Sequence, residues 1–174
     1  MNTESNILTE CFVDTLIIQT VISSKKEYNH QKGCNNVLKR MRIQFADKAA
    51  FGIIDDDKIV ANFNAFSLLK KHNEHLAIYR HSDKPHYIIK IGKAVEDFII
   101  HCAEQCDVSL ADYNLPTDLN TLKKRTKRAT LLNDNDFKKL FSALQKNNKS
   151  DFRKLEQWIE LFKANPYHVK VESL

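Results

Sequence analysis

Hydrophobic and polar residues at the start of the chain follow two different periods. Residues 6–10 form a short apolar stretch typical of a strand, and residues 12–23 are predicted to form a helix. A strand is the alternative for this second stretch, because residues 16–22 are rich in β-branched side chains. Residues 27–31 are predicted to form another short strand, which ends before Gly33.

The segment after Gly33 has the clearest helical pattern. Its apolar residues recur three and four positions apart, which predicts an amphipathic helix that buries one face. Residues 49–54 then form an apolar strand that runs directly into three acids. The apolar positions of the helix are Cys34, Val37, Leu38, Met41 and Phe45.

Strands and helices continue to alternate up to residue 106. Residues 62–72 have a helical pattern, whereas residues 75–81 and 86–91 are predicted strands. A turn around Asp83-Lys84-Pro85 joins these two strands. Helical spacing returns after Gly92, at the apolar positions Val95, Phe98, Ile99, Cys102 and Cys106.

Beyond Pro116 the pattern is helical only, with helices predicted at residues 118–128, 134–146 and 151–164. Strands that alternate with helices before this point indicate an α/β fold, a mainly parallel sheet flanked by helices. We therefore expect an α/β domain of residues 1–113 and a basic helical extension of residues 114–174.

The composition is that of a folded chain with uneven charge. Of 174 residues, 43% are hydrophobic, which excludes wholesale disorder. Residues 116–174 hold 13 basic and 7 acidic residues, whereas residues 1–115 hold 14 and 15, so the positive charge lies in the last third. Such asymmetry points to a polyanionic partner. No signal peptide or membrane span is visible and the four cysteines form no C-x-x-C pair, so we expect a cytoplasmic protein that does not bind membranes.

The three consecutive acids after strand 49–54 are the sharpest chemical feature. Side chains alternate along an extended backbone, so Asp55 and Asp57 point to one side and Asp56 to the other. Neighbouring carboxylates repel one another, and a hard cation such as Mg²⁺ relieves that repulsion. A solvated acidic turn is the simpler alternative.

A second acidic pair follows the first strand. Glu10 ends that strand, and Asp14 lies four residues later, at the start of the predicted helix. Ligands of parallel α/β sheets bind at the carboxyl ends of the strands. If the first and third strands are neighbours, Glu10, Asp14, Asp55 and Asp57 converge there. Ordinary helix-start acids, which the helix dipole favours, are the alternative for the first pair.

These motifs together resemble a Toprim domain, the catalytic fold shared by topoisomerases, bacterial primases and several nucleases. The order that carries the resemblance is a strand before Glu10, a helix with Asp14, Gly33 before a second helix, and an apolar strand before Asp55-Asp56-Asp57. The spacing of Glu10 and Asp14 is most similar to the nuclease branch, including the overcoming-lysogenization-defect type. The resemblance covers roughly residues 5–106.

The resemblance implies a role for each acid and a metal-dependent reaction. Glu10 would be an acid/base or metal-binding residue, and Asp55 and Asp57 would form the Asp-x-Asp pair. Asp14 would be an additional metal ligand, and Glu96 the later acid that some relatives use. The implied cofactor is Mg²⁺ or Mn²⁺, and the implied activity is nuclease-like action on phosphodiesters.

A basic cluster in the helical extension supplies candidate nucleic-acid contacts. Five of six consecutive residues are basic, and each such charge adds salt-dependent affinity for a phosphate backbone. A solvated basic helix is the alternative. The cluster consists of Lys123, Lys124, Arg125, Lys127 and Arg128.

Two departures from the Toprim pattern keep other functions open. Cys11 stands where many members have glycine, and the chain shows no Gly-rich ATPase loop. One alternative is a non-catalytic Toprim-like module that binds nucleic acid or a separate protein partner. Another is a receiver-like phosphoacceptor with Lys90 or Lys93 as its lysine.

Overall fold

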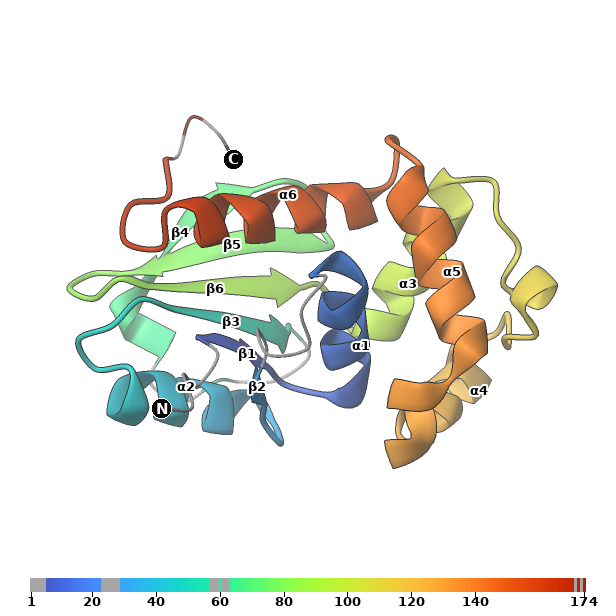
Figure 1. Ribbon diagram of the computed structural model, residues 1–174, viewed down its shortest axis with the longest axis horizontal. Helices are drawn as coiled ribbons and strands as arrows, with labels where there is room; N and C mark the ends of the chain where they lie inside the picture. Colours follow the sequence, from blue (N-terminus) through green and yellow to red (C-terminus); the bar gives the residue numbers. More distant parts are fainter. Residues whose placement is uncertain (1–5, 23–28, 57–59, 61–62, 171, 173) are drawn as a thin grey trace.

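The computed structural model describes residues 6–22, 29–56, 60, 63–170, 172 and 174 (Figure 1). The strands are β1 (Ile7–Thr9), β2 (Asn29–His30), β3 (Ala50–Asp55), β4 (Phe66–Lys71), β5 (Leu76–His81) and β6 (His86–Ile91). The helices are α1 (Phe12–Val21), α2 (Cys34–Gln44), α3 (Val95–Gln105), α4 (Leu119–Thr126), α5 (Asn135–Lys146) and α6 (Asp151–Ala164). Short 3₁₀ turns lie at Phe63–Ala65, Leu110–Tyr113 and Ala129–Asn133.

The strands form one mixed sheet in the order β2-β1-β3-β6-β5-β4. Four neighbouring strands, β2, β1, β3 and β6, are parallel, whereas β5 is antiparallel to both β6 and β4. The expected α/β class and the central run of parallel strands are therefore confirmed. Because β1, β3 and β6 are adjacent and parallel, their carboxyl ends meet at one edge of the sheet.

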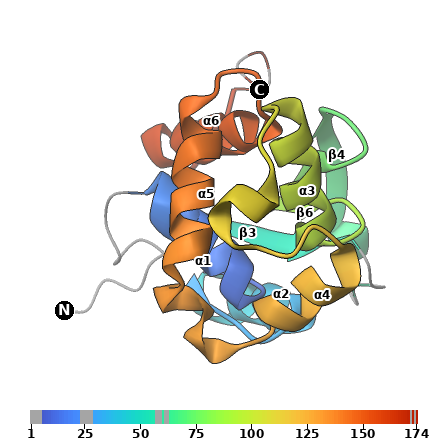
Figure 2. The same cartoon turned by 90° about the vertical axis from the view of Figure 1, so that its right-hand side faces the viewer.

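Helices cover the two faces of the sheet unequally. Phe51 and Ile53 of β3 belong to a large core that includes residues of α1, α3, α5 and α6. Ala50 and Ile54, which alternate with them, belong to a smaller core with α2. Figures 1 and 2 show α6 and α2 on opposite sides of the sheet.

The C-terminal helices complete the larger core. Phe162 of α6 packs on Phe51 with ring centroids 4.6 Å apart and lies 6.1 Å from the ring of Tyr87 in β6. Trp158 and Phe162 of α6 are almost fully buried. Residues on either side of the expected boundary at 113/114 thus share one core, and the division into two parts stays a prediction from the sequence.

Most predicted elements are confirmed, and one is wrong. The helix expected at residues 12–23 is confirmed over Phe12–Val21, and residue 23 lies outside the described residues. It begins at a capping box in which Cys11 and Asp14 bind each other's backbone N–H. The helix expected at residues 62–72 is instead a 3₁₀ turn followed by β4. This strand pairs with β5 at the edge of the sheet and is mostly exposed, so its side chains lack the alternation by which a strand is recognised.

Candidate active site

A cleft of about 560 Å³ lies at the carboxyl edge of the parallel strands. Its walls come from the segments after β1, β2 and β6, from the end of β3, and from α4. Figure 2 looks toward this end of the molecule, where α1, α3 and α4 gather. The topology thus brings together segments that are far apart in the sequence, as expected for a ligand site of a parallel sheet.

Glu10 and Asp55 are direct neighbours in this cleft. The Glu10 backbone N–H donates to the Ile53 carbonyl at 3.1 Å, which extends the β1–β3 ladder by one residue. The Glu10 carboxylate in turn accepts a hydrogen bond from the Asp55 backbone N–H at 3.0 Å. Glu10 is 4% exposed, and Asp55 is partly exposed. The expected proximity of these two acids is a direct result of the strand order.

Asp14 lies beside the cleft and does not line it. Its Oδ2 accepts a hydrogen bond from the Cys11 backbone N–H at 3.1 Å, as part of the capping box of α1. Its Oδ1 is buried and has no hydrogen-bond partner. Burial raises the pKa of Asp14 to about 7, and the negative charges of Glu10 and Glu96 add to this rise. The structure therefore gives Asp14 a capping contact, in a position where its charge is poorly compensated.

Of the other two acids in the run Asp55-Asp56-Asp57, the structure describes only Asp56. Asp57 lies outside the described residues. Asp56 is exposed, does not line the cleft, and forms an ion pair with Lys90 Nζ at 2.6 Å. Lys90 Nζ also lies 4.4 Å from the centre of the Phe63 ring, on the α2 face of the sheet. Asp56 thus points away from the cleft, as the alternation of side chains predicted.

Glu96 reaches the cleft from the first turn of α3. The segment before it needs Gly92, because a Cβ atom there would lie 2.0 Å from the Glu74 carbonyl oxygen. Glu96 is 8% exposed and accepts a hydrogen bond from the Thr126 hydroxyl. This contact joins the start of α3 to the end of α4, and so fixes the basic cluster against the acidic side of the cleft.

The five basic residues of the cluster are not equivalent. Lys123 and Lys127 line the cleft, whereas Lys124 and Arg128 are exposed outside it. The Arg125 guanidinium binds the carboxylates of Asp134 and Asp136 and donates to the Asn114 carbonyl at 2.6 Å. Arg125 therefore holds α4 to the start of α5, which distinguishes it from the two lysines that face the cleft.

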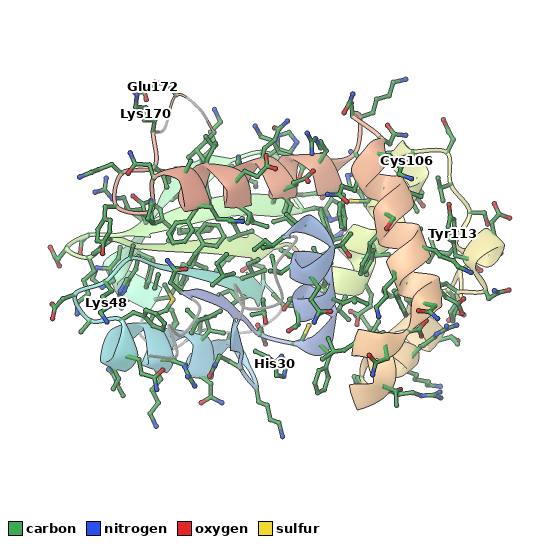
Figure 3. All side chains as sticks on the ribbon, viewed as in Figure 1. His30, Lys48, Cys106, Tyr113, Lys170 and Glu172 are labelled. Atoms are coloured by element: carbon green, nitrogen blue, oxygen red, sulfur yellow. The ribbon has the colours of Figure 1, made fainter. Side chains whose placement is uncertain are left out.

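The end of β2 and the segment after it contribute residues that the sequence pattern did not single out. His30 and Lys32 line the cleft, and Gly33 at the start of α2 has a backbone φ of +89°, which favours glycine. The His30 ring, labelled in Figure 3, stacks on Phe12 at 4.5 Å. Burial lowers its pKa, which favours the neutral ring. Their position at and after the carboxyl end of a predicted strand is the signal that could have identified His30 and Lys32. This end of β2 faces the same edge of the sheet as the ends of β1 and β3.

The donor set suits a hard cation, although it is not assembled as a finished site. Glu10, Asp55 and Glu96 offer carboxylate oxygens, the ligands that Mg²⁺ and Mn²⁺ take in proteins. Within the described ranges, no three acidic, histidine or cysteine side chains are arranged to hold a metal ion. A metal would therefore need the carboxylates to turn from their present hydrogen-bond donors.

Comparison with known proteins adds no support to the resemblance noted in the sequence, which depends on these residues alone. No family model matches the chain, and neither the curated proteins nor the solved structures give a match. The four cysteines are free thiols. None of the described helices has the length and apolar character needed to cross a membrane.

Proposed function

We propose that the protein is a Mg²⁺- or Mn²⁺-dependent enzyme of Toprim type that acts on the phosphodiester bonds of nucleic acid. One observation carries this proposal: Glu10, Asp55 and Glu96 line a single cleft together with Lys123 of α4 and Lys127, which follows it. Carboxylates for a metal and cations for a phosphate backbone are the two requirements of such a reaction. The nuclease branch, without an ATPase domain, is the variant that we favour.

The helix ends around the cleft add to the attraction for phosphate. Both α2 and α3 begin at the cleft, and neither has a side-chain cap at its first turn. Uncapped N–H groups and the positive end of the helix dipole favour an anion. Lys32, Lys123 and Lys127 bring positive charge to the same place. A phosphate group near the carboxylates is thus offset by backbone dipoles and by lysines.

Each residue has a defined part in the proposed reaction. Glu10 and Asp55 would hold the metal, with Glu96 as a further ligand once it leaves Thr126. A bound metal of this kind activates a water molecule and stabilises the departing oxygen. Lys123 and Lys127 would bind the phosphate and oppose the charge that develops on it. Asp14 and Asp57 remain proposed ligands, and Asp14 would offer its Oδ1, which has no hydrogen-bond partner, while Oδ2 keeps its contact to Cys11.

A non-catalytic module that binds nucleic acid or a separate protein partner is the second candidate. The observation that favours it is that Glu10 and Glu96 already accept hydrogen bonds from Asp55 and Thr126. A receiver-like phosphoacceptor fits less well, because Lys90 is paired with Asp56 and does not line the cleft. A cytoplasmic location remains part of the proposal.

Metal binding and strand cleavage test the proposal directly. Wild-type protein should melt at a higher temperature in Mn²⁺ or Mg²⁺ than in EDTA, because a ligand of the folded state stabilises it. It should also cleave single- or double-stranded DNA or RNA only with the metal. Asp55→Asn should abolish both effects, whereas Asp56→Asn, the matched control on the other face, should retain them. Equal loss in the two variants, or metal-independent binding without cleavage, would favour the second candidate.

A further inference from the structure

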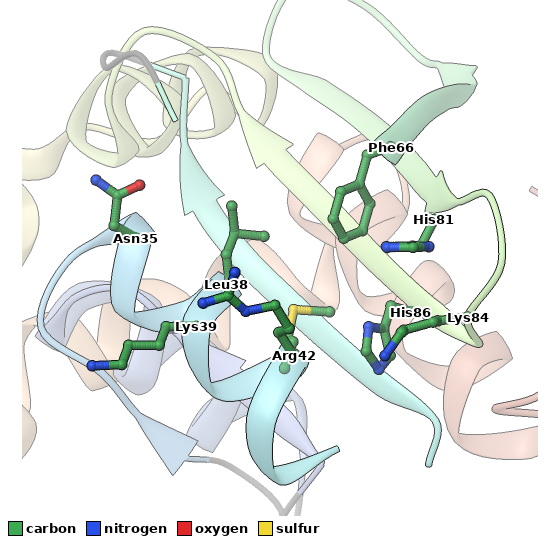
Figure 4. A pocket seen from close by; sticks show the side chains of 9 residues that line it. Asn35, Leu38, Lys39, Arg42, Phe66, His81, Lys84 and His86 are labelled. Carbon is green, nitrogen blue, oxygen red and sulfur yellow. The ribbon is translucent and has the colours of Figure 1, made fainter. Parts of the chain in front are cut away.

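A second pocket lies beside α2, on the face of the sheet that α2 only partly covers. It holds about 400 Å³ and is bounded by α2 on one side and by residues of β4, β6 and the β5–β6 hairpin on the other (Figure 4). This volume falls within the range of small-molecule sites. Gly33 lines the acidic cleft and Asn35 lines this pocket, so the start of α2 separates the two.

The inner surface of the pocket is apolar and aromatic. Leu38 and Met41 of α2 are buried and form part of one wall. Phe66 of β4 and His81 of β5 stand opposite, with ring centroids 5.0 Å apart and ring planes at 82° (Figure 4). Flat aromatic walls of this kind favour a planar ring as ligand.

The mouth of the pocket is positively charged. Lys39 and Arg42 lie one turn apart on α2, and Lys84 stands across from them in the turn between β5 and β6. Within the described part of the chain, these three side chains form no ion pair, and no acidic residue lines the pocket. Asp83, the acid of that turn, accepts a hydrogen bond from the Ser82 hydroxyl at 2.8 Å. The pocket therefore suits an anion.

His81 adds a neutral donor between the aromatic and charged parts. Its Nδ1 accepts a hydrogen bond from the Asp83 backbone N–H at 3.1 Å, which leaves the proton on Nε2. Burial lowers the pKa of His81, which favours the neutral ring. It can donate one hydrogen bond to a ligand, while the charge comes from the lysines and the arginine.

We propose that this pocket binds one nucleotide unit, with its base against Phe66 and His81 and its phosphate at Lys39, Arg42 and Lys84. An aliphatic anion would leave the aromatic wall without a partner, and an apolar ligand would leave three cations without one. The unit is either a free nucleotide or a nucleotide of a single strand, since the two share this chemistry. The proposal uses none of the acidic-cleft residues and stands apart from the proposed function.

Calorimetric titration of the whole protein distinguishes a nucleotide site from a general anion site. The probes are adenosine monophosphate, adenosine, inorganic phosphate and a deoxyadenosine pentanucleotide. Adenosine monophosphate should bind at least about tenfold more tightly than adenosine or phosphate, because only it uses both parts of the pocket. Tighter binding of the pentanucleotide identifies a strand as the occupant, and the reverse identifies a free nucleotide. Phosphate that binds as tightly as the nucleotide, or no nucleotide binding at millimolar concentration, overturns the proposal.

Variants assign the binding to this pocket. Arg42→Gln should weaken nucleotide binding by about tenfold through the lost phosphate contact. Phe66→Leu, which keeps an apolar side chain without an aromatic face, should weaken it by at least about fivefold. Lys139→Gln, an exposed cation on α5, is the matched control and should have no effect. Asp55→Asn should also leave binding unchanged, which separates this site from the acidic cleft. Unchanged affinity in both pocket variants, with unchanged melting temperatures, would contradict the proposal.

Discussion

Two buried aspartates, one beside the acidic cleft and one at the start of α6, have opposite surroundings. Asp151 is 5% exposed and accepts hydrogen bonds from His72 Nε2 at 3.0 Å, His101 Nε2 at 2.8 Å and Asn73 Nδ2 at 2.5 Å. Asp14 is fully buried and accepts one backbone hydrogen bond, from Cys11, and its second oxygen has none.

The pKa values of the two side chains follow these surroundings. Burial alone would raise the pKa of Asp151, but the bonds from Asn73, His101 and His72 outweigh it and hold the pKa below its ordinary value. Burial raises the pKa of Asp14 to about 7, since too few donors oppose it. A carboxylate that holds elements together is given donors, whereas one beside the cleft is left able to take a proton or a cation.

Removal of Asp151 should have the largest effect on stability. The aspartate joins α6 to the loop before β5 and to α3, and its loss would leave His101 and Asn73 without their acceptor. We expect Asp151→Ala to lower the free energy of unfolding by about 3 to 5 kcal/mol. Urea denaturation at pH 7 measures this, with the exposed Glu104→Ala on α3 as control. A loss below about 1 kcal/mol would show that the donors find other partners.

The Asp151 cluster also marks a limit of prediction from sequence. Its members come from three separate segments, and no spacing in the chain relates His72, His101 and Asp151. The same limit applies to Arg125, whose acceptors Asp134 and Asp136 are known only once α4 and α5 pack together. Contacts set by tertiary packing leave no local pattern.

The neighbouring positions of Glu10 and Asp55, in contrast, could be predicted. Both follow apolar strands, and carboxyl ends of adjacent parallel strands share one edge of the sheet. Asp14 was harder, because its partner in the capping box is Cys11, a residue outside the usual set of helix caps. The prediction of a helix at residues 62–72 was wrong for a physical reason as well. The edge strand β4 is mostly exposed, and an exposed strand needs no alternation of apolar and polar side chains.

The pH dependence of stability should separate the two aspartates. With a folded pKa of about 7 and an unfolded pKa near 3.9, Asp14 binds its proton more tightly in the folded state. Its contribution to stability is therefore present below about pH 4 and is lost as the pH rises to about 7. Asp151 has the opposite sign, because its folded pKa is lowered: its contribution is present above about pH 4 and is lost as the pH falls through that pKa.

Asp14→Asn removes the titrating group and keeps an acceptor for Cys11. The free energy of unfolding of the variant, minus that of wild type, should rise by on the order of 2 kcal/mol as the pH increases from about 4 to 8. Urea denaturation in EDTA at several pH values measures this without a contribution from bound metal. A difference between variant and wild type that stays constant with pH would mean that Asp14 keeps an ordinary pKa in the folded protein.

The basic cluster shows a similar contrast, between Arg125, which binds other side chains of the protein, and Lys127, which lines the cleft. Arg125 binds two carboxylates and a carbonyl with a side chain that is 25% exposed. We expect Arg125→Gln to cost about 1 to 2 kcal/mol in urea denaturation, through loss of charge-assisted hydrogen bonds. Its effect on nucleic-acid affinity should be small where folding is retained. A large loss of affinity with full stability would place Arg125 among the nucleic-acid contacts.

Lys127 should behave in the reverse manner, with the smallest effect on stability. It lines the cleft and is exposed, so Lys127→Gln should change the free energy of unfolding by less than about 0.5 kcal/mol. If Lys127 contacts a phosphate, the slope of log affinity against log salt should fall in magnitude by about 0.7 to 0.9. Fluorescence anisotropy with a labelled oligonucleotide between about 50 and 200 mM salt measures this slope.

Lys124→Gln, outside the cleft, is the matched control, and its slope should stay that of wild type because a strand held at the carboxylates passes Lys127 first. Equal slopes in all three proteins would remove Lys127 from the phosphate path and leave Lys32 and Lys123 as the cleft lysines of the proposed function.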